Sequence, residues 1–206
     1  MRATPRDNAL LQEVATGRFY LREQLQGLFF RSLNGPQKAQ ERLRKLHGAK
    51  QLKRRRVGSQ GGYIYYLDRW SEKYAHWLAL NWVYVSLVQQ AKSWQKIAVF
   101  MREYVYQDLR ADALACIDNT VQKKRQVFFV EVDQGTNPFT DKYRKVAERL
   151  EFALNPPWWS SGAFPPVLVV TGRPQRVQEA VEGSPVRYCI VTLDNIKQDI
   201  FKCLRR

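Results

Sequence analysis

The chain has 206 residues, of which 45% are hydrophobic, so it is long enough for one or two domains with a buried core and is not a disordered chain. Lysine and arginine number 34 against 19 acidic residues, which gives a formal net charge of +15. A surplus this large favours a polyanionic partner, with nucleic acid as the expected one and an anionic membrane as its competitor. A membrane span is not expected, because the longest apolar run, residues 76–88, contains Asn81 and is shorter than the roughly 20 residues required.

The first residues include no apolar segment, so no secretory signal peptide is expected. The three cysteines, Cys116, Cys189 and Cys203, are widely spaced and form neither a metal-ligand pair nor a disulfide framework. Cys116 and Cys189 lie in apolar runs and are interpreted as small core residues. A reducing cytoplasm is consistent with this pattern.

Apolar residues recur at helical spacing in three segments near the start of the chain, residues 8–15, 20–33 and 36–47. Two β-prone segments follow, residues 51–57 and 63–67, and the glycine-rich sequence between them predicts a hairpin. Three helices followed by a two-stranded hairpin are the layout of a winged helix-turn-helix. Its third helix would enter the major groove, and its hairpin would contact phosphates.

Basic side chains are concentrated on the third helix and the hairpin, where Glu41 is the only acid between residues 36 and 57. A charge run is usually a solvated face, but its position in this layout favours duplex DNA as the partner. Phosphate contacts by six or more of these residues predict a steep loss of affinity with salt. Residues 1–69 are therefore predicted to be a DNA-binding domain, with contacts from Lys38, Arg42, Arg44, Lys45, Lys53, Arg54, Arg55 and Arg56.

Residues 70–206 are predicted to form a second domain of mixed α/β class. The expected elements are a helix at 72–90, strands at 94–106, 109–117 and 127–133, a helix at 140–154, a strand at 167–171, a helix at 175–181, a strand at 187–193 and a helix at 196–204.

The strand at 127–133 ends with two acids, Glu131 and Asp133, whose i, i+2 spacing places them on one face. Val130 and Val132 occupy the other face. Two neighbouring acids near the end of a buried strand are costly unless a metal ion, lysine or arginine lies between them. The alternative is that both acids emerge into solvent at the strand end.

The order helix, strand, strand, strand, helix, strand, with acids on the second and third strands, matches the core of restriction-endonuclease-like nucleases. In such a site Asp112 would come from the middle strand, and Glu131 with residue 133 from the next. These three side chains would hold Mg²⁺, which polarises the phosphate and activates water. A lysine normally completes the site by stabilising the developing charge.

The segments at 110–113 and 128–136, together with Lys142 and Lys145, resemble the replication-relaxation family of plasmids and mobile elements. The resemblance covers about residues 10–172, and the Glu-x-Asp-x-Gly-Thr stretch is its most specific piece. It implies a winged helix joined to a restriction-endonuclease-like domain, and a role in plasmid replication and DNA relaxation or mobilisation. Plasmid duplex DNA and replication or mobilisation proteins are the implied partners. If the protein is instead a pure DNA-binding regulator, the second domain is expected to recruit a partner or to form a homodimer.

The chain departs from the nuclease signature at Ala111, where proline is usual, and at Asp133, where lysine is usual. Either Lys142 or Lys145 supplies the lysine, or the site is an inactive relic. The expected function is therefore DNA binding with a nuclease-like domain. The alternatives are an active Mg²⁺-dependent nicking endonuclease and a non-catalytic DNA-binding regulator. The candidate catalytic residues are Asp112, Glu131, Asp133, Lys142 and Lys145, and the first three are the candidate metal ligands.

Overall fold

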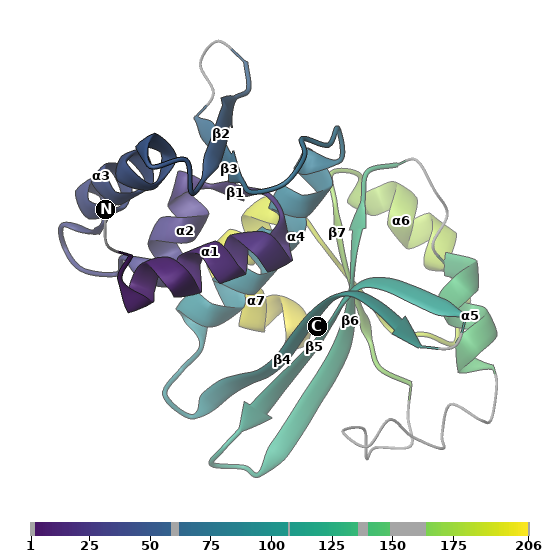
Figure 1. Cartoon of the computed structure of the whole chain (residues 1–206). Coiled ribbons are helices and arrows are strands. Elements are labelled where there is room, and N and C mark those ends of the chain that lie inside the picture. Colours follow the sequence, from purple (N-terminus) through teal and green to yellow (C-terminus); the bar gives the residue numbers. More distant parts are fainter. Residues whose placement is uncertain (1–2, 59–61, 107, 136–139, 149–163, 206) are drawn as a thin grey trace. The chain divides into compact units, whose positions relative to one another are not determined.

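The structure is a computed structural model that describes residues 3–58, 62–106, 108–135, 140–148 and 164–205. The chain forms two compact units, residues 1–89 and 90–206, shown in Figure 1. Helices and two β-sheets are both present, so the mixed α/β class predicted from the sequence is confirmed.

The first unit contains helices and a small antiparallel sheet with strand order β1-β3-β2. Figure 1 shows the β2–β3 hairpin projecting away from the helices of this unit. The predicted order of three helices and a hairpin is present, and the short strand β1 was not predicted. The winged-helix assignment itself stays a prediction. The elements are α1 (Pro5–Gly17), β1 (Tyr20–Leu21), α2 (Arg22–Phe29), α3 (Gly35–Gly48), β2 (Lys53–Arg56), β3 (Tyr63–Tyr66) and α4 (Tyr74–Gln90).

Helix α1 begins at Pro5, three residues before the predicted start, because a capping box stabilises its first turn. The main-chain N–H of Asp7 donates to Thr4 Oγ1 at 3.3 Å, and the main-chain N–H of Thr4 donates to Asp7 Oδ2 at 2.6 Å. Pro5 at the first helical position lacks an N–H that would in any case have no helical partner.

Helix α4 is joined to the first unit by buried polar contacts as well as apolar ones. The side-chain amide of Asn81 is buried, and its Nδ2 donates to the carbonyl oxygens of Gly17 and Phe19, both at 2.8 Å. Gln24 Nε2 donates to the carbonyl oxygen of Leu78, also at 2.8 Å. These bonds explain why most of α4 groups with residues 1–89, and the division predicted after residue 69 stays a prediction.

The second unit is built on a five-stranded sheet of order β4-β5-β6-β7-β8. The β4–β5 and β5–β6 pairs are antiparallel, whereas β6–β7 and β7–β8 are parallel. The predicted succession of elements is present. The expected continuation of the helix at 140 to residue 154 lies outside the described residues. The elements are β4 (Gln95–Tyr106), β5 (Leu109–Asn119), β6 (Lys124–Asp133), α5 (Thr140–Ala147), β7 (Val167–Thr171), α6 (Pro174–Val181), β8 (Tyr188–Val191) and α7 (Leu193–Arg205).

Side chains of β6 and β7 form the centre of the second core. Phe129 and Val169 pack in one cluster with Tyr143 and Val146 of α5 and Val177 of α6. Figure 1 shows α5 and α6 on one side of the sheet and α7 on the other. All residues of β7 are buried, as expected for a parallel strand covered on both faces.

The three cysteines are buried free thiols, which agrees with the interpretation of Cys116 and Cys189 as core residues. Within the described part of the chain, every helix is too short or too polar to cross a lipid bilayer.

Replacing Asn81 by alanine is expected to lower the free energy of unfolding by about 2–3 kcal/mol, because two buried carbonyl groups lose their donor. Urea denaturation followed by circular dichroism measures this change. Lys73→Ala, a substitution at an exposed position preceding the same helix, is the control and should change the stability by less than about 0.5 kcal/mol. Equal effects of the two substitutions would contradict the anchoring role of Asn81.

Candidate functional site

The candidate site lies where the parallel strands β6 and β7 end, at Asp133 and Thr171, which are paired in register. Carboxyl ends of parallel strands meet at one edge of a sheet, where side chains from several elements converge. Asp112 of β5 reaches this edge, because its Oδ2 accepts a hydrogen bond from the main-chain N–H of Val132 at 2.8 Å. A side chain of β5 thus satisfies a main-chain group of β6.

Glu131 is the buried acid of the site, with 5% of its surface exposed. Its Oε1 accepts a hydrogen bond from the Tyr143 hydroxyl at 2.5 Å and lies 2.8 Å from Lys142 Nζ. The same ammonium group donates to the carbonyl oxygen of Arg110 at 2.6 Å. Two consecutive residues at the start of α5 therefore supply the donors that a buried carboxylate requires.

Burial raises the pKa of Glu131, and the nearby Asp112 carboxylate raises this pKa further, whereas Lys142 and Tyr143 oppose the shift. Burial also raises the pKa of Tyr143 well above its usual value, and the Glu131 carboxylate acts in the same direction. Tyr143 therefore remains a protonated donor at neutral pH. The structure thus brings together Asp112, Glu131 and Lys142 of the residues singled out from the sequence.

Asp133 is turned toward different partners. Its Oδ2 accepts a hydrogen bond from Thr171 Oγ1 at 2.9 Å, and its Oδ1 accepts one from the main-chain N–H of Gly135 at 2.8 Å. Among the described residues, no group of three or more His, Cys, Asp or Glu side chains could hold a metal ion. Mg²⁺ is often held by only one or two carboxylates with water molecules, and Asp112 and Glu131 are the neighbouring carboxylates of this edge that could serve as such ligands.

The two candidate lysines differ in position. Lys142 contacts Glu131, whereas Lys145 is exposed and contacts none of the three acids. The sequence analysis did not single out Tyr143, which lies in the predicted helix at 140–154, or Thr171, which ends the predicted strand at 167–171. The available signal for Tyr143 was chemical, because a buried tyrosine hydroxyl usually requires a hydrogen-bond partner.

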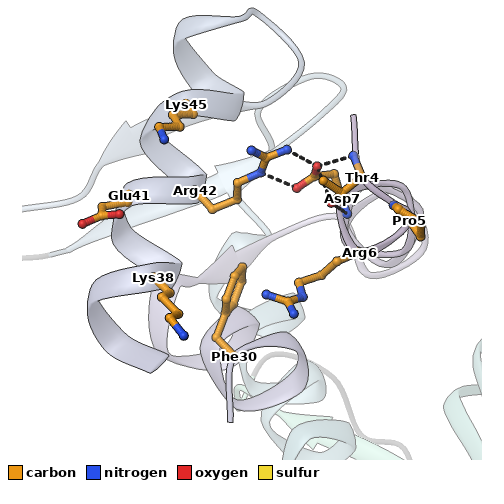
Figure 2. Close-up of a pocket in the computed structure, with 9 residues that line it drawn as sticks. All are labelled: Thr4, Pro5, Arg6, Asp7, Phe30, Lys38, Glu41, Arg42 and Lys45. Atoms are coloured by element: carbon orange, nitrogen blue, oxygen red, sulfur yellow. Dashed lines mark hydrogen bonds and ion pairs between the residues drawn. The ribbon is translucent and has the colours of Figure 1, made fainter. Parts of the chain in front are cut away.

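In the first unit, Lys38, Arg44 and Lys45 of α3 are exposed, whereas the guanidinium group of Arg42 is hydrogen-bonded to Asp7. Figure 2 shows Arg42 directed toward Asp7 at the start of α1, beside a cavity of about 530 Å³. Both guanidinium bonds are made to a carboxylate that is 1% exposed, and Arg42 lowers the pKa of Asp7. Arg42 therefore holds α3 against α1, which leaves it poorly placed for the DNA contact predicted from the sequence.

The hairpin holds its basic side chains through local contacts. The Arg54 guanidinium lies over the Tyr63 ring at 4.2 Å, and that of Arg55 lies over the Trp70 ring at 4.5 Å. Lys53 Nζ donates to the carbonyl oxygen of Asp68 at 2.8 Å. Cation–π contacts restrict the arginine side chains while leaving their charge intact.

The raised pKa of Glu131 predicts a specific dependence of stability on pH. Its contribution is present below its ordinary pKa and is lost as pH rises through the folded-state value. The unfolding free energy of the natural protein, relative to Glu131→Gln, should therefore fall as pH increases above 4.5. Urea denaturation at a series of pH values tests this, with the exposed Glu179→Gln as the control. A relative stability that rises with pH would show that Lys142 and Tyr143 lower the pKa of Glu131 by more than burial raises it.

Comparison with known proteins places the described site within a family. The description "replication-relaxation" belongs to the family profile that matches residues 68–168. The comparison with curated proteins gave no match. Among solved structures, the crystal structure of protein VC1899 from Vibrio cholerae is similar at 12% identity with a TM-score of 0.39. That match covers 98% of this chain and 58% of the other, so the chain spans little more than half of that protein.

The matched segment contains the acids at 112, 131 and 133 and both lysines of α5, as the sequence resemblance implied. Through residues 68–168, this chain belongs to the replication-relaxation family.

Proposed function

We propose that this protein binds duplex DNA of a plasmid or mobile element and acts in its replication, relaxation or mobilisation. The observation that carries the proposal is the exposed basic surface of α3 and the β2–β3 hairpin in a chain with a net charge of +15. Replication or mobilisation proteins are its expected protein partners.

Helix α3 has the arrangement that a DNA-contacting helix requires. Ala39, Leu43 and Leu46 are fully buried and fix the helix to the first core, so the opposite side is free to face DNA. Arg44 and Lys45 are exposed on that helix, and Gln37 and Gln40 are exposed one or two turns before them. Arginine and glutamine side chains have the donors and acceptors that read base edges in the major groove.

The hairpin complements this helix by presenting charge suited to phosphates. Arg55 and Arg56 are exposed on β2, and Arg55 is already restricted by its contact with Trp70. A restricted side chain loses less conformational entropy when it binds. Contacts from the helix specify position in the groove, and contacts from the hairpin fix orientation on the backbone.

The double substitution Arg44→Ala/Lys45→Ala is expected to weaken duplex binding. It should also reduce the slope of the logarithm of the binding constant against the logarithm of the salt concentration by about one unit per lost phosphate contact. Alanine favours helix, so α3 should remain folded. The matched control is Lys123→Ala/Lys124→Ala, which removes the same charge from exposed positions in the second unit. Fluorescence anisotropy at several salt concentrations measures the affinity of both variants for duplex DNA. Similar losses in both variants would indicate attraction by net charge alone, and unchanged binding would contradict the role of α3.

A second candidate function, Mg²⁺-dependent nicking of DNA, is favoured by the contact of 2.8 Å between Lys142 and Glu131 beside Asp112. Asp112 and Glu131 would hold the metal ion, which would supply Lewis-acid chemistry and an activated water when bound. Lys142 would stabilise charge that develops on the phosphate. The substitution of aspartate for the usual lysine at position 133 instead favours a non-catalytic DNA-binding regulator.

Conversion of supercoiled plasmid to the open-circular form, with Mg²⁺ or Mn²⁺ present, distinguishes these candidates. If the site is active, Lys142→Ala should reduce nicking by about 100-fold or more, because the cation next to Glu131 is lost. Lys145→Ala is the matched control on the same helix and should retain activity. Asp112→Asn and Glu131→Gln should abolish it. If the natural protein fails to nick while binding DNA, the nicking function is wrong and the binding function stands.

A further inference from the structure

Two arginines converge beside the candidate site, over the turn that follows β6. Gly135 in this turn has φ +79°, a conformation that favours glycine. A methyl group placed on Gly135 would lie 3.3 Å from Nη1 of Arg173 and 3.8 Å from Nη1 of Arg176. Both guanidinium groups therefore lie over the same residue, and the missing side chain of Gly135 makes room for them.

The position of Arg173 is set by a chain of hydrogen bonds that starts at the site. Its main-chain N–H donates to Thr171 Oγ1 at 2.9 Å, and the same hydroxyl donates to Asp133 Oδ2 at 2.9 Å. Arg176 follows on the first turn of α6. The arginine pair thus belongs to the edge of the sheet that carries Asp112, Glu131 and Asp133.

Like charges that converge repel each other unless an anion lies between them. Within the described residues, neither guanidinium has a carboxylate at ion-pair distance, and both side chains are exposed. Asp133, the nearest acid in the turn, directs one oxygen to Thr171 and the other to Gly135. Two exposed planar cations therefore lie against the same residue, Gly135.

We propose that Arg173 and Arg176 form a phosphate-binding pair that holds the nucleic-acid backbone at the carboxyl edge of β6 and β7. The choice of ligand rests on the proposed function, because DNA is the expected polyanion. A phosphate offers several oxygens, and the fork of an arginine binds two of them with directed hydrogen bonds.

This pair would give the second unit its own contact with DNA. Asp133 lies two residues after Glu131 on β6 and is linked through the Thr171 hydroxyl to the main chain of Arg173, so the arginines and Glu131 belong to the same edge of the sheet. A DNA strand bound along this edge would have one phosphate held by the two arginines. A neighbouring phosphate of the same DNA strand would then be presented to Asp112, Glu131 and Lys142. Arg173 and Arg176 would be positioning residues.

The direct test uses the full chain and a 5′-phosphorylated thymidine trinucleotide as the probe. Side-chain Nε–H resonances of Arg173 and Arg176 should shift and saturate together in an NMR titration. The unphosphorylated nucleoside should leave them unchanged. The natural protein and the control Lys123→Ala/Lys124→Ala should bind the probe equally, whereas Arg173→Ala/Arg176→Ala should lose this binding. Absence of a shift at both arginines, or an equal loss in the control, would overturn the proposal.

A second measurement keeps this proposal separate from the proposed function. In duplex binding, Arg173→Ala/Arg176→Ala should flatten the salt dependence by about one to two units of slope, in addition to the loss caused by Arg44→Ala/Lys45→Ala. Arg173→Lys/Arg176→Lys should restore the slope but not the full affinity, because lysine keeps the charge without the fork. Trinucleotide binding without duplex binding would refute the proposed function while supporting the arginine site. Duplex binding unaffected by the double alanine variant would restrict the site to free or terminal phosphates and overturn its role with backbone DNA.

Discussion

The buried carboxylate of Glu131 is the constraint on which the second unit depends. A carboxylate that is 5% exposed loses its hydration and must be stabilised by donors within the protein. Lys142 and Tyr143 provide them from consecutive positions of α5, so the helix is fixed to β6 at one register. Phe129 and Tyr143 then pack their rings against each other, with centroids 5.5 Å apart. The polar contact and the apolar core therefore specify the same placement of α5.

Comparison of the three acids shows how neighbouring residues of one type can acquire different roles. Asp112 accepts from a main-chain N–H of β6, Glu131 accepts from side chains of α5, and Asp133 accepts from β7 and its own turn. Each carboxylate links β6 to another element. Of these three acids, Asp112 lies near enough to Glu131 to raise its pKa, and Lys142 contacts Glu131 at 2.8 Å.

Neighbouring basic residues of α3 likewise have different roles, either in packing or at the surface. Arg42 lies in a run of cations, yet its guanidinium is bound to a buried acid that also caps α1. Its neighbours Arg44 and Lys45 are exposed. A charge run in a sequence shows neither of these outcomes, because consecutive helical residues point in directions about 100° apart and only some of them face the core. The surplus of charge predicts the class of partner, and the packing determines which basic side chains are exposed.

Apart from the short strand β1, the sequence by itself determined the elements and their order, since alternating and helical spacings of apolar residues are local signals. The strand at 167–171 and the hairpin strands were predicted at nearly their observed limits, and the acids at 131 and 133 were correctly placed on one face. Only the tertiary structure decided that Lys142 rather than Lys145 contacts Glu131, that Asp133 turns to Thr171, and that Arg173 and Arg176 meet over Gly135. These contacts join residues far apart along the chain. They depend on the pairing of β6 with β7 and on the rotation of α5 about its axis, which no local pattern of residues specifies.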